Sequence, residues 1–164
     1  MSTIGKSDSK KPTHWVKHAS GHFTVTLKDG VNETVYKNSN VHFLRTGPLS
    51  LIYCIFNDWP FDPGATYPAI WISTSAPLEI REYAIKPEPS ADEFFGLFAT
   101  YSNGSVGGDN AGTGALKIKA LYDAQNFIHI EGEAEFDYEL SDGRTINIFI
   151  NEFTAQYHPP IIRS

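Results

Sequence analysis

Cysteine is nearly absent from this sequence of 164 residues, since Cys54 is the only one. A single cysteine excludes a disulfide within the chain. Cys54 lies in the apolar run LIYCIF, residues 51–56, which supplies neither a base nor a positive charge to activate the thiol. We therefore expect a buried, unreactive thiol at this position rather than a catalytic nucleophile.

Basic residues are also scarce. The 13 Lys and Arg are outnumbered by 19 Asp and Glu, so the formal net charge is -6 and the isoelectric point lies near 5.4. Binding nucleic acid by neutralising phosphates needs a surplus of Lys and Arg on one face, so we expect no nucleic-acid partner. The one basic cluster, Lys6, Lys10, Lys11 and Lys17, indicates a solvated, flexible N-terminal tail over residues 1–13.

The sequence has no long hydrophobic run. The longest, Leu51 to Phe56, is far shorter than the roughly 20 residues that span a bilayer. The N-terminal stretch MSTIGKSDSKKPT also lacks the apolar segment of roughly 7 to 15 residues that a secretory signal contains. These absences predict a cytoplasmic protein without membrane attachment.

Bulky apolar residues are plentiful, because the chain contains 41% hydrophobic residues, including 11 Phe, 8 Tyr and 3 Trp. A chain of this size can bury a substantial core, and we expect a single domain over residues 14–164. Short segments rich in β-branched and aromatic residues, separated by turn residues, recur from Gly21 onward. This pattern predicts an all-β fold, an antiparallel β-sandwich or β-barrel of about eight to ten strands with at most one short helix.

The first half of the chain shows two kinds of strand pattern. Residues 22–30, HFTVTLKDG, alternate apolar and polar residues and end at the turn signal Asp29-Gly30. Residues 49–56, LSLIYCIF, are apolar at nearly every position, which is typical of a strand covered on both sides. Further strand candidates are residues 31–37, 41–44, 69–74 and 78–85.

Two stretches in the middle interrupt this pattern. Residues 89–98, PSADEFFGLF, suggest a short helix because Ser90 and Glu93 have the spacing of a capping box. A strand from Phe94 to Tyr101 is the competing interpretation. Residues 103–114, NGSVGGDNAGTG, are rich in glycine without a large apolar side chain, which predicts a mobile loop.

The C-terminal third has the clearest pattern. Residues 126–140, NFIHIEGEAEFDYEL, alternate between an apolar and a mainly acidic face. A three-residue loop, Ser141 to Gly143, then predicts a hairpin in which Leu140 pairs with Arg144. This register places Tyr138 opposite Ile146, Phe136 opposite Ile148 and Ala134 opposite Ile150.

The strand before it completes a three-stranded meander from Ala115 to Tyr157. Its apolar residues face those of the next strand if Asp123 to Gln125 form the loop. That register sets Lys117 against Glu131 and Lys119 against His129, a favourable arrangement of charges.

Glu131, Glu133 and Glu135 form an acidic stripe that is the first candidate binding surface. A calcium site is a weak interpretation, because side chains two apart on a straight strand lie about 6.6 Å apart and calcium is normally wrapped by a loop. The stripe is either a solvated outer face or a docking surface for a basic protein partner.

Residues 57–68, NDWPFDPGATYP, are the second candidate, because Trp59, Phe61 and Tyr67 lie in a loop stiffened by prolines. Rigid aromatic side chains lose little entropy on contact, which suits recognition of sugar, lipid or protein. The alternative is that these rings cap an end of the core.

The spacing of His14, His18 and His22 would suit a metal ion on a helix. Gly21 and the strand that follows argue against a helix, and in an extended chain these histidines lie about 13 Å apart. We therefore expect no metal site and no cofactor. The sequence also contains no G-x-S-x-G elbow and no phosphate-binding loop, so it identifies no catalytic residue.

Three C-terminal segments, GALKIKALYD, IEGEAEFDYEL and DGRTINIFINEFTAQY, resemble the closing strands of uncharacterised bacterial lipocalin-like or β-sandwich proteins. Gly114, Gly132, Phe136, Gly143 and Phe153 carry the resemblance. It implies an all-β fold and offers no catalytic residue. Those proteins are typically exported lipoproteins, whereas this sequence shows no lipoprotein signal, and it has Asn151 where a glycine is expected.

These features predict a non-enzymatic binding protein that recognises another protein, as an immunity or adaptor protein does, through a sheet face and the aromatic loop. The alternatives are a small apolar ligand or carbohydrate bound in a barrel cavity or at that loop, or an enzyme that uses interior polar groups such as His42 or Tyr53. An enclosed cavity would favour these alternatives. A homodimer is one way to cover two exposed sheet edges.

Overall fold

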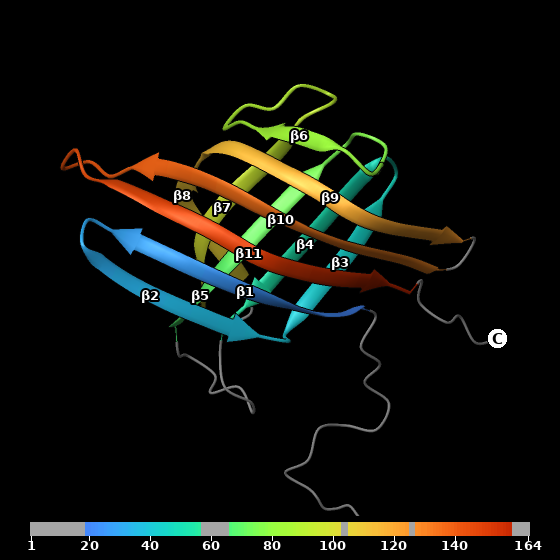
Figure 1. Ribbon diagram of the computed structural model, residues 1–164, viewed down its shortest axis with the longest axis horizontal. Coiled ribbons are helices and arrows are strands. Elements are labelled where there is room, and N and C mark those ends of the chain that lie inside the picture. Colours follow the sequence, from blue (N-terminus) through green and yellow to red (C-terminus); the bar gives the residue numbers. More distant parts are fainter. Residues whose placement is uncertain (1–18, 57–65, 103–104, 125–126, 159–164) are drawn as a thin grey trace, which may run out of the picture.

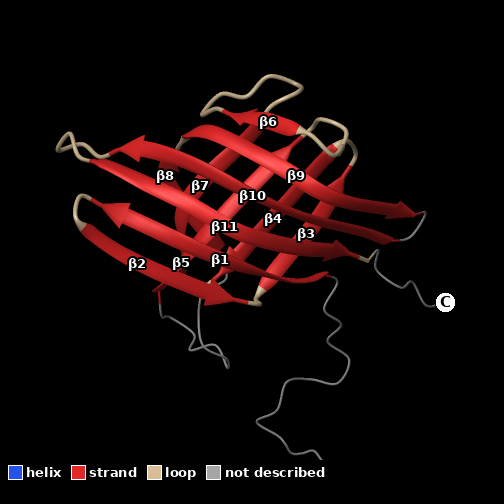
Figure 2. Cartoon of the chain, viewed as in Figure 1, coloured by secondary structure: helices blue, strands red, loops and turns tan. Residues whose placement is uncertain are grey.

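A computed structural model describes residues 19–56, 66–102, 105–124 and 127–158 (Figure 1). All regular structure within these ranges is β-strand, so the all-β prediction is confirmed (Figure 2). The strands are β1 (Ala19–Asp29), β2 (Asn32–Asn38), β3 (Val41–Thr46), β4 (Leu49–Ile55), β5 (Thr66–Thr74), β6 (Glu82–Ile85), β7 (Phe94–Ser102), β8 (Ser105–Ala111), β9 (Thr113–Ala124), β10 (Phe127–Glu139) and β11 (Thr145–Tyr157).

The strands form one 11-stranded sheet in the order β2-β1-β11-β10-β9-β6-β7-β5-β4-β3, with β8 as an additional partner of β7. Their pairing is antiparallel except between β6 and β7. The sheet folds over into a front layer of β2, β1, β11, β10 and β9 and a rear layer of β3, β4, β5 and β7, which crosses behind it at a steep angle (Figure 1). Because β3 also packs against β1 and β11, the sheet is a nearly closed barrel.

The hydrophobic core lies between the two layers. Alternate residues of each strand point inward, and Phe23, Phe43, Phe136 and Phe153 are almost completely buried. The rings of Phe23 and Phe153, from neighbouring strands, lie 5.5 Å apart between centroids. Each buried side chain of this size stabilises the fold by about 1.5–3 kcal/mol. Cys54 is part of the same core and is fully buried, as expected.

Gly114, which carries part of the family resemblance, and the neighbouring Gly112 have packing roles. A Cβ atom at Gly112 would overlap the ring of Phe136, and one at Gly114 would overlap the backbone of β10. These glycines let β8 and β9 turn the corner of the barrel close against Phe136. Gly143 has a positive φ of 89°, which its hairpin turn requires.

The predicted hairpin of β10 and β11 is confirmed residue by residue. Leu140 and Arg144 are hydrogen-bonded across the turn, with Leu140 N donating to Arg144 O at 2.8 Å. The pairs beyond it are Tyr138 with Ile146, Phe136 with Ile148 and Ala134 with Ile150. The alternation of apolar and acidic residues therefore determines which face of β10 points inward.

The predicted register of β9 is wrong. Lys117 pairs with Glu133 rather than Glu131, and His129 pairs with Tyr122 rather than Lys119. The main reason is that β9 continues to Ala124, which pairs with Phe127, so the pairing near the turn is displaced from the prediction by three residues. A β-bulge in β9 next to Lys119 then changes the pairing by one residue. Asp123, expected in the loop, is part of the strand. The extra residue lets Leu121 pack against the core in place of Ala120.

Two predictions for the middle of the chain are also resolved. Ser90 N donates to Glu93 Oε1 at 3.0 Å, as in a capping box, but this contact closes a turn and β7 begins immediately afterwards. The strand interpretation of Phe94 to Tyr101 is thus confirmed. The prediction of a loop over residues 103–114 is wrong, because Ser105–Ala111 form β8 and pair with β7. Glycine is uncommon in strands, so this segment carries no local strand signal, and backbone pairing with β7 holds its glycines in the strand.

Candidate functional site

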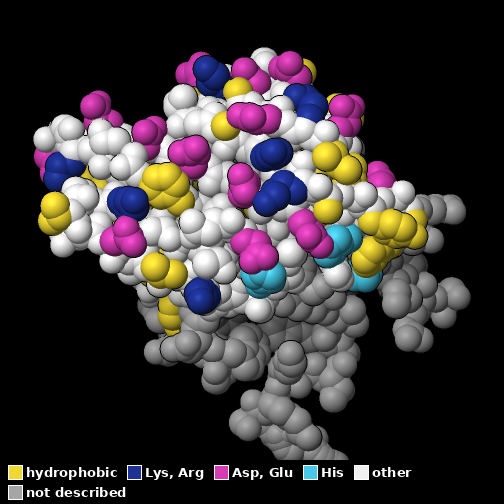
Figure 3. All heavy atoms as spheres, in the orientation of Figure 1, with side chains coloured by type: hydrophobic (Ala, Val, Ile, Leu, Met, Phe, Trp, Pro, Cys, Tyr) yellow, Lys and Arg dark blue, Asp and Glu magenta, His cyan; other side chains and the backbone are white. Residues whose placement is uncertain are grey.

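The acidic residues chosen from the sequence share one surface. Glu131, Glu133 and Glu135 are exposed and alternate with buried residues of β10. They therefore lie on the outer face of the front layer, where acidic and basic side chains are interspersed (Figure 3). Tyr67 lies on β5 in the rear layer, so the structure does not bring it to the acidic stripe. Trp59 and Phe61 fall outside the described residues.

Histidine contributes no metal site within the described ranges. His14 and His18 lie outside them, and His22 points outward from β1, with Nε2 3.5 Å from Oε1 of Glu152. Its Nδ1 lies 3.2 Å from Thr154 Oγ1. No group of three or more His, Cys, Asp or Glu side chains in this part of the chain is arranged to hold a metal ion.

Opposite charges face one another across β6, β9 and β10. Lys117 pairs in register with Glu82 on one side and with Glu133 on the other. Lys119 Nζ lies 3.3 Å from Glu133 Oε1. Among the residues that the structure describes, no Lys, Arg or His nitrogen lies within 4.0 Å of a carboxylate oxygen of Glu82 or Glu135. The negative charges of Glu82 and Glu135 are therefore not neutralised by a neighbouring ion pair in this part of the chain, and they are available to an incoming cation.

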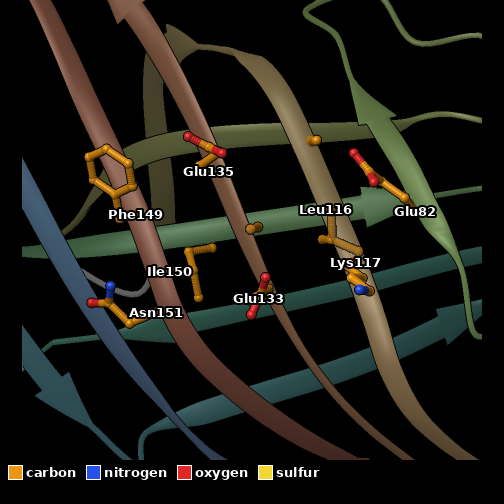
Figure 4. A pocket seen from close by; sticks show the side chains of 10 residues that line it. Glu82, Leu116, Lys117, Glu133, Glu135, Phe149, Ile150 and Asn151 are labelled. Atoms are coloured by element: carbon orange, nitrogen blue, oxygen red, sulfur yellow. The ribbon is translucent and has the colours of Figure 1, made fainter.

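A groove of about 290 Å³ runs over this region (Figure 4). Ala115 forms part of its floor, because a methyl group there leaves space between longer side chains. A second hollow of about 200 Å³ shares Ala115, Glu135 and Phe149 with the first and extends it toward Asp137. Side chains that line the first hollow are Glu82, Lys117, Glu133, Glu135, Phe149 and Asn151.

A bulge in β11 shapes one wall of the groove. The pairing of β11 shifts by one residue at Asn151 against both β1 and β10. As a result Asn151 and Glu152 are both exposed, whereas the residues on either side of them are buried. Thr26 Oγ1 donates to Asn151 Oδ1 at 2.7 Å and holds this side chain toward β1. Bulges commonly re-aim side chains beside binding sites.

Phe149 supplies an aromatic wall. It is half-buried on the outer face of β11, and Lys28 Nζ lies 5.1 Å from its ring centroid. A cation at this distance is attracted by the ring's negative face. The groove therefore combines carboxylates with an aromatic ring, a combination that suits Lys or Arg side chains of a partner.

Sequence reasoning found the two glutamates of β10 but missed Glu82, Phe149 and Asn151. Glu82 reaches the groove only through the pairing of β6 with β9, which is remote in sequence. A signal for the bulge was present, because Asn151 and Glu152 interrupt the alternation of β11 between Ile150 and Phe153.

The outer face of the rear layer is very different. His42, Tyr53 and Trp71 form a stack across β3, β4 and β5, with ring centroids 4.7 Å and 5.8 Å apart. Burial raises the pKa of the Tyr53 phenol, and the nearby Tyr101 raises it further. The expectation that His42 and Tyr53 line the barrel interior is wrong, because the alternating residues Val41, Phe43, Ile52 and Cys54 take the inward positions.

Within the described ranges, no helix has the length and apolar character of a membrane span. The chain matches no protein-family model, no curated protein and no solved structure in the comparisons with known proteins.

Proposed function

We propose that this protein is a non-enzymatic binding protein that recognises a basic protein partner through the outer face of β9, β10 and β11. The groove beside Glu135 carries the proposal, because it places the carboxylates of Glu82, Glu133 and Glu135 around an aromatic wall at Phe149. Lys or Arg side chains of the partner would lie against these carboxylates. Phe149 would contribute apolar area and cation–π contact.

The small free energy that each exposed ion pair contributes favours a protein over a single small cation as the binding partner. One exposed ion pair contributes only about 0.2–1 kcal/mol, so useful affinity needs several pairs together with buried apolar area. The two connected hollows extend along the strands from Glu133 to Asp137 and offer such a row. Long paired strands hold the carboxylates in place before binding, which lowers the entropy cost of association.

The rival interpretations have less support. The inward positions are filled by phenylalanines and aliphatic side chains rather than by polar groups arranged around a ligand. An adaptor or immunity role in the cytoplasm is part of our proposal, and the acidic net charge of the chain supports its part in binding a basic protein. A distant kinship with lipocalin-like or β-sandwich proteins is proposed in the same sense and is supported by the nearly closed all-β sheet.

The experiment compares immobilised wild-type chain with a Glu82→Gln/Glu135→Gln double variant in capturing proteins from an extract of the native host. We expect the wild type to retain a protein with a basic surface and the double variant to lose it. Binding should also disappear at about 1 M NaCl, where the Debye length is about 3 Å. Glu79→Gln/Glu88→Gln, at two exposed residues outside the groove lining, is the control that removes the same number of charges. Equal capture by the wild type and the double variant would contradict the proposal.

A further inference from the structure

Aromatic side chains gather at one end of the front layer, where β9 and β11 end and β10 begins. Figure 3 shows hydrophobic side chains at this end beside histidine and acidic ones. The ring of Phe127 contacts two others, since its centroid lies 5.8 Å from that of Tyr122 and 5.0 Å from that of His158. Tyr122 is 60% exposed and His158 is also exposed. We name these three side chains the end cluster.

Strand register places the end cluster on the same outer face as the acidic stripe. Tyr122 pairs directly with His129 across β9 and β10, and Phe127 precedes His129 by two residues. Glu131 follows His129 by two residues, and the residues between them, Ile128 and Ile130, are buried. Diagonal neighbours of this kind are within reach of long and aromatic side chains. The end cluster and the carboxylate of Glu131 are therefore adjacent on one surface.

The β-bulge in β9 leaves one side of Glu131 open. Ala120, whose side chain is a single methyl group, pairs with Glu131. Lys119, the bulged residue, reaches Glu133 instead, with Nζ 3.3 Å from Oε1. Among the described residues, no Lys or Arg nitrogen lies within 4.0 Å of the Glu131 carboxylate.

Histidine holds the other side of this carboxylate. His129 Nε2 lies 2.8 Å from Glu131 Oε2. A carboxylate only accepts hydrogen bonds, so Nε2 is the donor. His129 Nδ1 is covered and makes no hydrogen bond in the described part of the chain, so Glu131 is the polar contact that orients the ring. When the imidazole is neutral, this contact fixes the position of the carboxylate without neutralising its charge.

We propose that the end cluster and Glu131 form a binding site for the guanidinium group of an arginine side chain. This inference rests on the proposed function, because the arginine belongs to the basic partner that the groove binds. The guanidinium lies flat against the exposed ring of Tyr122 and donates N–H groups to the carboxylate of Glu131.

Charge complementarity selects a cation, and the aromatic rings select arginine over lysine. A guanidinium is planar and weakly hydrated, stacks on aromatic faces and has five N–H donors. A lysine ammonium is compact and strongly hydrated, so it gains less from an exposed ring. The end cluster would give a lysine little beyond the charge of Glu131. The site therefore discriminates between two side chains of the same charge.

The distance to the groove fits a single partner. Glu131 and Glu135 lie on the same face of β10, four residues and therefore about 13 Å apart. Side chains four residues apart in an extended segment have the same spacing. A partner segment with two basic residues at this spacing would contact the groove and the end cluster together. Two linked contacts bind more tightly than either contact alone.

The test is isothermal titration of the full chain with arginine and lysine homopeptides of equal length, at low ionic strength, where surface charges are least screened. We expect the arginine peptide to bind about threefold more tightly. Tyr122→Leu should remove this preference by weakening the arginine peptide alone. Tyr122→Phe keeps the ring face and should keep the preference. Glu131→Gln should weaken both peptides, and Glu88→Gln, at an exposed residue between β6 and β7, is its matched control.

Folding of every variant is checked by circular dichroism, and the exposure of Tyr122 makes its replacement tolerable to the fold. Equal affinity of the wild type for the two peptides would overturn the arginine site, as would absence of binding or an arginine preference that survives in Tyr122→Leu.

The capture experiment with Glu82→Gln/Glu135→Gln separates this inference from the proposed function. Loss of the captured protein in that double variant, together with an unchanged arginine preference in Tyr122→Leu, would leave the groove proposal standing and reject the arginine site alone. The opposite result, normal capture by the double variant and a preference lost in Tyr122→Leu, would support the arginine site and contradict the groove.

Discussion

The ring of Phe153 occupies the space that any side chain at position 132 would need. A Cβ atom at Gly132 would lie 2.9 Å from Phe153 Cε1, closer than real Cβ contacts allow, and would overlap the carbonyl oxygen of Lys117 as well. Phe153 is fully buried and cannot move toward solvent. The two residues are therefore a matched pair within the core of the front layer.

This pair leads to a prediction about stability. Gly132→Ala should lower the free energy of unfolding by about 2–3 kcal/mol, the upper range for overpacking, measured by urea denaturation. Gly132→Ala combined with Phe153→Leu should be no better than Phe153→Leu alone, because the Lys117 carbonyl still opposes the added methyl group. Gly30→Ala is the comparison, since its Cβ would meet no atom within 4 Å and only its positive φ of 64° opposes alanine. A smaller loss in the free energy of unfolding for Gly132→Ala than for Gly30→Ala would show that packing against Phe153 and Lys117 is not the cause.

A second prediction concerns the groove. Ala115→Lys should fill its floor with a cation and weaken binding of the basic partner at least tenfold, which corresponds to about 1.4 kcal/mol. Thermal stability should change little, because residue 115 points outward. Isothermal titration with the captured partner checks the affinity. Val31→Lys, at a fully exposed position in the turn between β1 and β2, is the control that should bind almost normally. Similar losses in both variants would point to net charge rather than to the groove.

Stability should also fall at high pH because of Tyr138. Burial raises the pKa of its phenol to about 12, with further contributions from Asp29 and Tyr36. The unfolded chain loses this proton near pH 10. The folded state therefore binds the proton more tightly, and its stabilising effect is complete below about pH 10 and disappears as the pH rises to about 12.

Urea denaturation of the wild type and of Tyr138→Phe between pH 9 and pH 11, in steps of roughly one pH unit, checks this effect. The variant should show a shallower decline in stability than the wild type. Tyr122→Phe, whose ring is 60% exposed on β9, should decline like the wild type. Parallel curves for the wild type and Tyr138→Phe would rule out a role for this phenol.

The bulge at Asn151 gives a fourth prediction. Deleting Asn151 would leave Glu152 alone between Ile150 and Phe153, so strict alternation would return and Phe153 and Ala155 would still point inward. We therefore expect the deletion variant to keep a sharp thermal transition but to bind the basic partner more weakly, because the Asn151 wall of the groove is lost. Asn151→Gly keeps the residue count and should cost only about 1 kcal/mol. A deletion variant without a cooperative thermal transition would show that the bulge is needed for folding.

The contrast between β10 and β9 shows how far the sequence predicts the fold. The β10 and β11 register was predictable because strict alternation meets a turn with one glycine, Gly143, at a defined place. The register of β9 was not, because β9 continues to Ala124 through Asp123, a residue type typical of loops, and because no special residue type marks the bulge beside Lys119. Glycine-rich β8 is held by pairing with β7, and such long-range pairing leaves no local signal.

The candidate site likewise contains residues that the sequence predicts and residues that it does not. Glu133 and Glu135 were predictable because outward positions on an alternating strand can be counted from the sequence. Glu82 was not, because only the closure of the sheet through β6 brings it to Lys117. The aromatic face of the rear layer was partly foreseeable, since residues 49–56 are apolar on both sides of the strand.

The sheet path begins at β2 and ends at β3, and these strands are joined only through Ser39 and Asn40. Across this seam β3 meets β1 by side-chain packing, because no backbone ladder links them among the described residues. A barrel closed in this way can open locally between β3 and β1 without breaking the hydrogen bonds of a strand pair. Amide hydrogens near this seam should exchange with solvent well before those of β10, whose ladders on both sides have to be dismantled first.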